Sequence, residues 1–454
     1  MDKFDTIWRP YSPDAKSPWN LRRVVHLHRR AGFAATWGEI QRDLKDGPKA
    51  SLDRVLVGKA ATEGVPDAFH KTADLLGESA TSSGDPARLK AWWVYRMVFG
   101  PDPLTERLAL LWHNHFATSN LKVENLAFMR RQNELFRKLG RGPFGEFLSA
   151  VVHDPAMLVW LDAPSNRKGH PNENLARELM ELFSMGVGHY TEADVKEAAR
   201  ALTGWSLKDE TFTEVFARHD SGEKTILGHK GPWKGDDLVR LVLEHPATSR
   251  RLAGRVCEWF LGETALQTAD VASLAEGLQA RKLDMGWAVD TVLRSRTFFA
   301  DLNLGNRVLS PVEYVIGAAR ALELFEPPSS TLVLAEWCGR LGQDLFYPPN
   351  VGGWPGGRSW LTTRSLIGRA NYAAALVEGK RVGRPGAMDA LALAWLHGDK
   401  DVVAFYTRLL LGTDPAPEWR ALLAAGVDPN VAEEAEAARR TVALILATPE
   451  AQLS

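Results

Sequence analysis

The chain has 454 residues, which is enough for a large hydrophobic core and for two or three domains. Its 45% hydrophobic and 24% charged residues are typical of a soluble globular protein. The 55 basic and 56 acidic side chains leave a net charge of -1, so the charge balance argues against a nucleic acid as partner.

The N-terminus and the hydropathy determine the expected compartment. The first residues, MDKFDTIWRPYSPDAK, carry charges of both signs and lack the apolar segment of a signal peptide. No uninterrupted apolar run reaches the length of a transmembrane helix. We therefore expect a cytoplasmic protein, while export with a partner, or from a start codon further upstream, stays open. Cys257 and Cys338 lie among apolar residues, which predicts buried free thiols.

Helical patterns dominate the chain in order, and only a few segments depart from them. The expected helices cover residues 21–31, 37–44, 88–99, 103–118, 124–139, 144–161, 248–260, 271–281, 286–295, 311–324, 331–341 and 363–377, with more from 388 to the end. Residues 64–85 end in the Ser- and Gly-rich SATSSGDP, and we expect them to be a loose segment and a solvent loop. The pattern predicts a mainly α-helical protein.

No linker divides the chain clearly. The best candidate boundary, residues 379–386, separates a main helical domain (1–380) from C-terminal helices (381–454). We expect those last helices to pack on the same domain, which makes one large helical unit.

Two non-helical segments stand out. Residues 211–216 and 224–227 have short β-like patterns on either side of HDSG, which predicts one small β-hairpin with His219 and Asp220 in its turn. Both residues are candidates for binding a substrate or partner. Residues 346–360, FYPPNVGGWPGGRSW, form a Pro/Gly/Trp-rich loop. Trp354 and Trp360, with Arg358 beside them, could stack on sugar rings or on a partner; alternatively, their indoles fill the core.

The densest polar face lies on a helix that begins near Asn172. Its Leu, Ala, Met and Phe residues cover one broad arc, and the opposite narrow arc carries Asn174, Arg177, Glu178 and Glu181. Arg177 is spaced to pair with Glu181, and Asn174 with Glu178. The arc contains no Lys, and histidines lie in the turns on either side, which favours a site over an ordinary solvated face. The next helix should begin with a capping box at residues 191–194.

Two histidines extend this hypothesis to a metal. On the helix that begins at residue 103, His115 lies on the face of the leucines and His113 points the opposite way. Histidines two residues apart cannot both bind one metal from a regular helix, and they could converge only if the helix ended near His113. The alternative for His115 is a hydrogen-bonded core histidine. If His115 or His113 met Glu178 and Glu181, the set would suit a divalent metal, and a spare carboxylate could act as general base.

Several long motifs together resemble the bacterial domain-of-unknown-function family 1800. They are LLWHNHF (110–116), NENLARELMELFSMGVGHYTEADVKEAARALTGW (172–205), RHDSGEKTILG (218–228), HPAT (245–248), VLRSRTFF (292–299), PPNVGGWPGGRSW (348–360) and LATPEAQ (446–452). The resemblance implies a single helical domain without an established activity. It also implies that relatives are often secreted and often encoded beside a family with a phosphatase- or sulfatase-like fold.

Two functional hypotheses follow. In the first, the polar face and the histidines form a metal-assisted hydrolase in which Arg177 holds an anionic substrate and Glu178, Glu181 and Asn174 support the chemistry. In the second, the protein is a non-catalytic partner or scaffold that uses the Trp-rich loop. A phosphatase- or sulfatase-like protein is the candidate partner that the resemblance implies.

Overall fold

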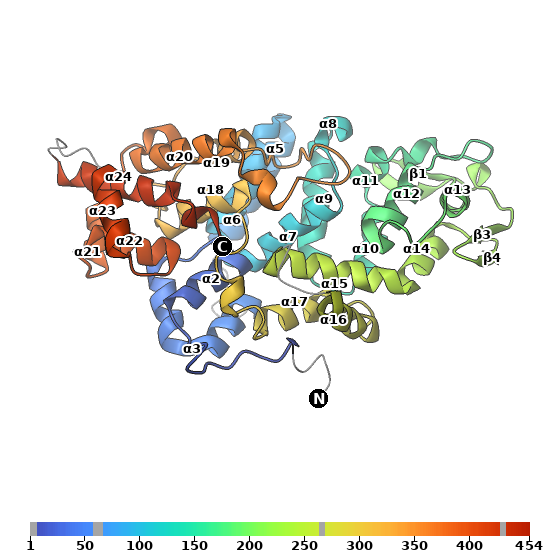
Figure 1. Ribbon diagram of the computed structural model, residues 1–454. Helices are drawn as coiled ribbons and strands as arrows, with labels where there is room; N and C mark the ends of the chain where they lie inside the picture. Colours follow the sequence, from blue (N-terminus) through green and yellow to red (C-terminus); the bar gives the residue numbers. More distant parts are fainter. Residues whose placement is uncertain (1–6, 58–66, 263–267, 427–432) are drawn as a thin grey trace.

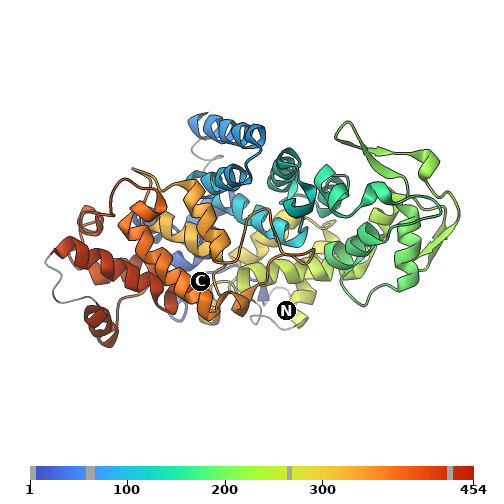
Figure 2. The ribbon, with the colours of Figure 1, turned by 90° about the horizontal axis from the view of Figure 1, so that it is seen from above.

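The computed structural model describes residues 7–57, 67–262, 268–426 and 433–454. The molecule is elongated, and helix α15 (Pro246–Leu261) crosses its centre (Figure 1). Two small hairpins lie at one end and the C-terminal helices at the other, an arrangement that is also visible from above (Figure 2). The predicted mainly helical fold is confirmed.

Helices follow one another in both halves of the chain. The first half contains α2 (Leu21–Ala31), α3 (Trp37–Val57), α5 (Asp67–Ser83), α6 (Pro86–Phe99), α7 (Pro103–His115), α8 (Asn120–Val123), α9 (Leu126–Leu139), α10 (Phe144–Val152), α11 (Pro155–Trp160), α12 (Asn174–Met180), a π-helix η2 (Glu181–Met185) and α13 (Glu192–Ala201). The second half contains α14 (Gly235–Glu244), α15, α16 (Thr268–Ala280), α17 (Met285–Arg294), α18 (Pro311–Ala321), α19 (Thr331–Arg340), α20 (Thr363–Glu378), α21 (Ala390–Leu396), α22 (Val402–Leu411), α23 (Pro417–Gly426) and α24 (Glu434–Ala447). No helix in the described ranges is both long enough and apolar enough to cross a membrane.

Two hydrophobic cores share this fold, and α7 lies between them. Its Leu104, Leu108 and Leu111 face the first core, which is built mainly from α10 to α17. Its Ala109 and Leu110 face the second core, which is built mainly from α6 and α18 to α24. Because one helix contributes to both cores, α7 is buried on almost every face. The end of α7 therefore lies where the two halves of the molecule meet.

The C-terminal helices belong to the second core. Buried residues of α21, α22 and α24 join the same cluster as those of α6, α18 and α20. The cluster thus takes residues from both sides of position 380, and apolar packing crosses that position without a break.

The expectation for residues 67–83 is wrong. These residues form the regular helix α5, which packs on α6, while residues 64–66 lie outside the described ranges. Gly77 lowers helix propensity, but a Cβ there would come within 2.7 Å of the Arg130 guanidinium and 3.0 Å of Trp92 Nε1. Close packing against other helices thus accounts for a glycine inside this helix.

The strands pair differently from the prediction. Residues 211–216 and 224–227 do not pair with each other. Strand β1 (Trp205–Lys208) pairs with β2 (Thr211–Glu214), and β3 (Lys224–Ile226) pairs with β4 (His229–Gly231). Each hairpin turns at two residues with positive φ: Asp209 and Glu210 (48° and 60°), and Leu227 and Gly228 (50° and 80°). Positive φ at both positions is the geometry of a tight two-residue hairpin, which the sequence signals only weakly without Asn-Gly.

Candidate functional site

The polar side chains predicted on one face of α12 form hydrogen bonds with nearby residues other than those that the spacing predicted. Arg177 donates to Glu192 at 2.8 Å and to Glu173 at 3.0 Å, rather than to Glu181 as the helical spacing predicted. Asn174 donates to the Asp162 carboxylate at 3.0 Å. The helix changes to the π-helix η2 at Glu181, where Ser184 donates to the Leu179 carbonyl at 2.5 Å. Glu181 is the first residue of this π-helix, and its hydrogen-bond partner is Tyr190.

Glu178 and Glu181 remain neighbours. Tyr190 donates a hydrogen bond to Glu181. Burial, together with the charge of Glu181, raises the pKa of Glu178 above its ordinary value. The pair is therefore a half-buried acidic spot on the surface of the first core.

The two histidines occupy separate apolar surroundings. His113 lies between the rings of Trp93, Phe136 and Phe346, with Asn133 Nδ2 3.0 Å from its Nε2. Burial and then the Arg137 charge lower the pKa of His113 to about 3, so the ring is neutral at physiological pH.

His115 is held by the backbone. Its Nε2 lies 3.1 Å from the Phe183 carbonyl oxygen, and burial holds its pKa well below the ordinary value. Over the described ranges, no three His, Cys, Asp or Glu side chains gather closely enough to hold a metal ion. The predicted set of His113, His115, Glu178 and Glu181 therefore has no supporting geometry there. Cys257 and Cys338 are buried free thiols, as expected.

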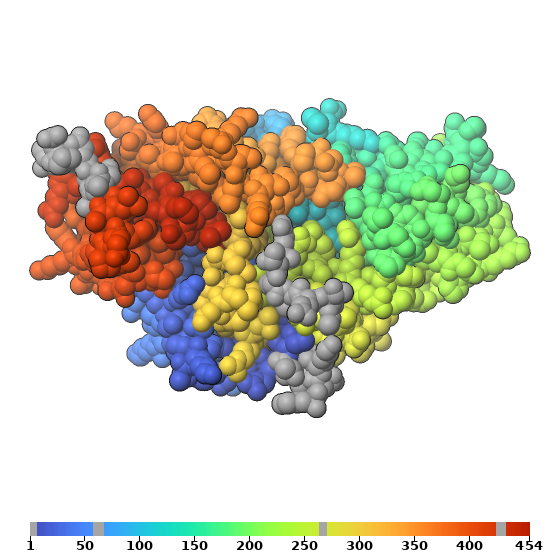
Figure 3. Space-filling model, viewed as in Figure 1, coloured from blue at the N-terminus to red at the C-terminus, as the bar shows by residue number. Residues whose placement is uncertain are grey.

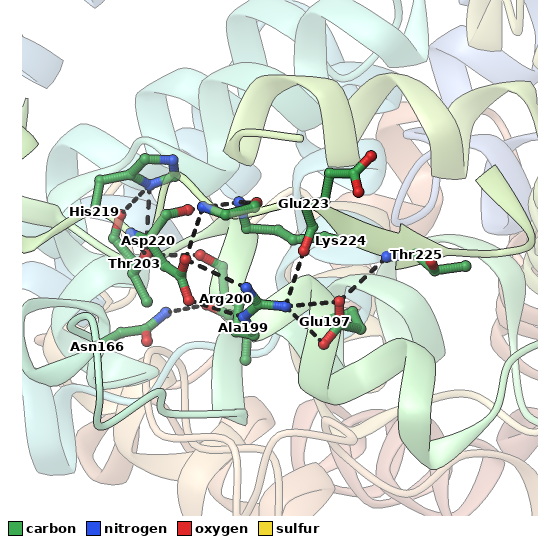
Figure 4. A network of polar contacts seen from close by, with 11 residues as sticks. Asn166, Glu197, Ala199, Arg200, Thr203, His219, Asp220, Glu223, Lys224 and Thr225 are labelled. Atoms are coloured by element: carbon green, nitrogen blue, oxygen red, sulfur yellow. Dashed lines mark hydrogen bonds and ion pairs between the residues drawn. The ribbon is translucent and has the colours of Figure 1, made fainter. Parts of the chain in front are cut away.

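His219 and Asp220 belong to a network around Arg200 (Figure 4). Arg200 forms hydrogen-bonded ion pairs with Asp220 at 2.8 Å and with Glu197 at 2.8 Å. His219 Nδ1 lies 2.9 Å from the Thr203 carbonyl oxygen. Arg200 lowers the pKa of Asp220 to about 2. These contacts connect α13 to the segment that precedes β3, and none of the network's buried side-chain nitrogens or oxygens lacks a partner.

The Trp-rich loop buries its indoles. Trp354 and Trp360 are 4% and 6% exposed, so they lie against the second core rather than forming an outer stacking surface. Asn114 connects the loop to the end of α7, because its Oδ1 accepts from the Trp354 backbone N–H at 2.7 Å. Gly353, with a φ of 87°, permits this approach, since a Cβ there would lie 2.3 Å from Asn114 Oδ1. Arg358 remains exposed at the tip.

A cavity of about 150 Å³ opens between this loop and α15. Its walls combine segments far apart in sequence, and the main side chains are Asn114, Arg255, Trp259, Arg307, Trp354 and Arg358, with Glu258 at the edge. We call it the α15 cleft. Figure 3 shows the loop, in light orange, and α15, in lime, on the same face of the molecule.

The α15 cleft contains hydrogen-bond donors without partners. The Nε1 of Trp354, the Nε1 of Trp259 and the Nε of Arg255 are all buried and make no hydrogen bond within the described chain. A buried donor without a partner costs about 1–3 kcal/mol, so native proteins rarely leave several in one place. Three side chains that line the cleft therefore carry hydrogen-bonding capacity that the described chain leaves unused.

A buried charge cluster lies beneath the cleft. Glu313 is 2.6 Å from Arg307 and 2.5 Å from Arg107, and both guanidinium groups lie over the ring of Trp259, at 5.4 and 4.8 Å from its centre. Burial alone would raise the pKa of Glu313, but Arg107 and Arg307 hold it well below its usual range. Burial lowers the pKa of Arg107 to about 10, which reflects the cost of keeping its charge out of water.

The charges in and beneath the cleft do not balance. Four guanidinium groups (Arg107, Arg255, Arg307 and Arg358) accompany two carboxylates (Glu258 and Glu313). Arg255 donates to Glu258 at 3.0 Å, whereas Arg358 has no ion-pair partner in the described part of the chain. The excess is positive, and it coincides with the unpaired donors. Chemically, the cleft can therefore accept an anion.

A family model described as "Protein of unknown function (DUF1800)" matches residues 26–453. The chain belongs to this family. No curated protein and no solved structure matches it. The predicted resemblance is thus confirmed over nearly the whole chain, and membership adds no activity to the geometry.

The sequence interpretation missed most of the cleft. It selected Trp354, Trp360 and Arg358 but not Arg255, Trp259 or Arg307. It also chose the histidines of His113-Asn114-His115, although Asn114 is the residue that contacts the loop. The only available signal was the helix that follows HPAT, in which Arg251 and Arg255 share a face at i, i+4.

Proposed function

We propose that the protein binds an anionic ligand in the α15 cleft through a phosphate, sulfate or carboxylate group. The supporting observation is the coincidence of unpaired buried donors with a local excess of arginine. Guanidinium groups hold such oxyanions through paired hydrogen bonds, and these bonds are stronger where water is excluded. Arg358 would bind at the mouth, and the indole N–H of Trp354 would donate from the wall.

This proposal belongs to the ligand- and partner-binding class of function. Metal-assisted hydrolysis has less support, because the described residues bring donors together in the cleft but gather no set of metal ligands. The Trp-rich loop keeps a role in binding, although through Arg358 and an indole N–H instead of exposed aromatic faces.

The test is thermal unfolding and titration calorimetry with inorganic phosphate against chloride at constant ionic strength. A ligand that binds only the folded protein raises the unfolding midpoint. We expect phosphate to raise it, and Arg358→Gln to weaken phosphate binding by about threefold to fivefold, the effect of an exposed ion pair.

Two further variants sharpen the test. Trp354→Phe keeps an aromatic ring but removes the N–H, and should also weaken binding. Arg240→Gln on α14, which removes a half-exposed arginine paired with Asp237 and Glu244, is the matched control and should bind phosphate normally. If phosphate has no effect, or if Arg240→Gln and Arg358→Gln behave alike, the proposal is wrong.

A further inference from the structure

A second, more open cavity adjoins the α15 cleft. It has a volume of about 570 Å³ and lies between α15 and the segment that includes Gly186, Val187 and His189. The two cavities share the lining residues Arg255, Glu258 and Gly262, so they adjoin each other along α15, and we treat them together as one depression. We call the whole depression the α15 groove.

The groove follows one face of α15. Arg251, Arg255 and Glu258 are spaced i, i+4 and i+7, which places them in a row along the helix. From Arg251 to Gly262 the helix rises about 16 Å, at 1.5 Å per residue. An extended peptide covers that length with about five residues.

The second cavity adds positive charge of its own. Arg250 is exposed and Arg251 is half-buried, and neither has an ion-pair partner in the described ranges. Arg251 donates its Nε–H to the Leu182 carbonyl at 3.1 Å, which connects α15 to η2. Burial, and then the neighbouring Arg255 charge, lower the pKa of Arg251. Glu258 and Glu181 act in the opposite direction, and an acidic ligand would add to their effect.

The opposite wall contains one exposed apolar side chain. Met185, Val187 and His189 line it; Val187 is 76% exposed, whereas Met185 is buried. The groove therefore has a row of arginines on α15 facing the exposed side chain of Val187.

We propose that the α15 groove binds an extended acidic peptide segment of a partner protein. Its carboxylates would pair with Arg250, Arg251 and Arg255, and an aliphatic side chain would contact Val187. The inference rests on the proposed function, because one end of the peptide would occupy the anion site of the cleft. An acidic peptide fits better than a nucleic acid, since Glu258 ends the arginine row and the facing wall presents the aliphatic side chain of Val187.

The experiment is fluorescence anisotropy on the full chain. The probe is a fluorescein-labelled hexapeptide of sequence Glu-Leu-Glu-Glu-Leu-Glu, and the matched control peptide replaces each Glu with Gln. We expect the acidic peptide to bind at least about tenfold more tightly than its Gln control, because several carboxylate contacts act together.

The protein variants separate the two proposals. Arg250→Gln removes an exposed side chain without disturbing the fold, and Arg251→Gln probes the half-buried position. Each should weaken the peptide by about threefold to fivefold and leave phosphate binding in the cleft unchanged. Arg240→Gln should change neither.

Each remaining outcome decides against one proposal. If phosphate binds through Arg358 but the Arg250 and Arg251 variants bind the peptide normally, the inference fails and the proposed function stands. If phosphate does not bind at all, the proposed function is wrong, and so is the inference that rests on it. The inference also fails if the Gln peptide binds equally well, or if a single-stranded oligonucleotide or a sulfated polysaccharide binds more tightly than the acidic peptide.

Discussion

The Arg200 network and the α15 cleft both depend on arginine, yet they differ in how completely their polar groups are paired. Arg200 bonds to two carboxylates and a backbone carbonyl, and its network leaves no buried side-chain polar atom unpaired. In the cleft, Arg255 and two tryptophans keep buried donors without partners. A fully paired cluster stabilises the fold, whereas an incompletely paired one offers its hydrogen bonds to a ligand.

The two regions also differ in charge. The two cations of the Arg200 network, Arg200 and Lys224, are balanced by the two carboxylates of Glu197 and Asp220. The cleft and the layer beneath it carry more guanidinium groups than carboxylates. The following substitutions test this comparison, beginning with the largest expected effect.

Removing the carboxylate beneath the cleft should be the most damaging change. Glu313→Gln leaves Arg107 and Arg307 buried without their shared counter-ion, and breaking a buried pair in this way costs about 3–5 kcal/mol. Urea unfolding at neutral pH measures the loss. The variant should also gain more stability from added phosphate than the wild type, since the cleft becomes more positive. If phosphate stabilises the variant and the wild type equally, Glu313 does not influence anion binding in the cleft.

Changing the paired network should affect stability alone. Arg200→Gln removes several hydrogen bonds and leaves two partly buried carboxylates, at a cost of about 1–3 kcal/mol to the free energy of unfolding. Phosphate binding should not change. A loss of phosphate binding in this variant would contradict the distinction between the two regions.

The same network predicts a pH dependence. Arg200 holds the pKa of Asp220 at about 2, below the value near 3.9 of an unfolded chain. The contribution of Asp220 to stability is therefore complete above about pH 4 and disappears as the pH falls toward 2. Unfolding measured between pH 5 and pH 2 should show this loss in the wild type, and a weaker one in Arg200→Gln.

The smallest effect is expected at the half-buried acidic spot. Burial and Glu181 raise the pKa of Glu178, so the folded state holds its proton more tightly and stability falls as the pH rises past about 4.3, the unfolded value. Glu178→Gln should remove that dependence and stabilise the protein slightly at pH 7, by less than about 1 kcal/mol. Urea midpoints at pH 4 and pH 7 provide the comparison. A destabilised variant would show that the ionised carboxylate has a favourable partner.

Local patterns predicted much of the helical framework. The capping box at Thr191 and Asp194 is present, and Leu104, Leu108 and Leu111 do share one core-facing side of α7. These features depend on contacts within one or two helical turns, which a sequence displays directly. The glycine inside α5 and the positive φ angles of the hairpin turns were harder to predict from the sequence. The first depends on packing against other helices, and the second on strand pairing.

Most of the candidate site could not be predicted from the sequence, for a different reason. The polar face of α12 could be read from spacing, but its partners came from other elements: Glu192 for Arg177 and Asp162 for Asn174. Spacing shows which side chains share a face, and it does not show what that face meets.

The sequence by itself determined a helical protein, its family and the residues that pair within one turn. Only the tertiary structure decided which arginines are paired and which are not. Arg200 and Arg255 both stand in helices with a glutamate three residues away. One is completed by Asp220, from the segment before β3, while the other faces a cavity walled by α7, α15 and the Trp-rich loop. Whether a polar group is satisfied depends on what distant segments bring to it, and that depends on how the two cores assemble around α7.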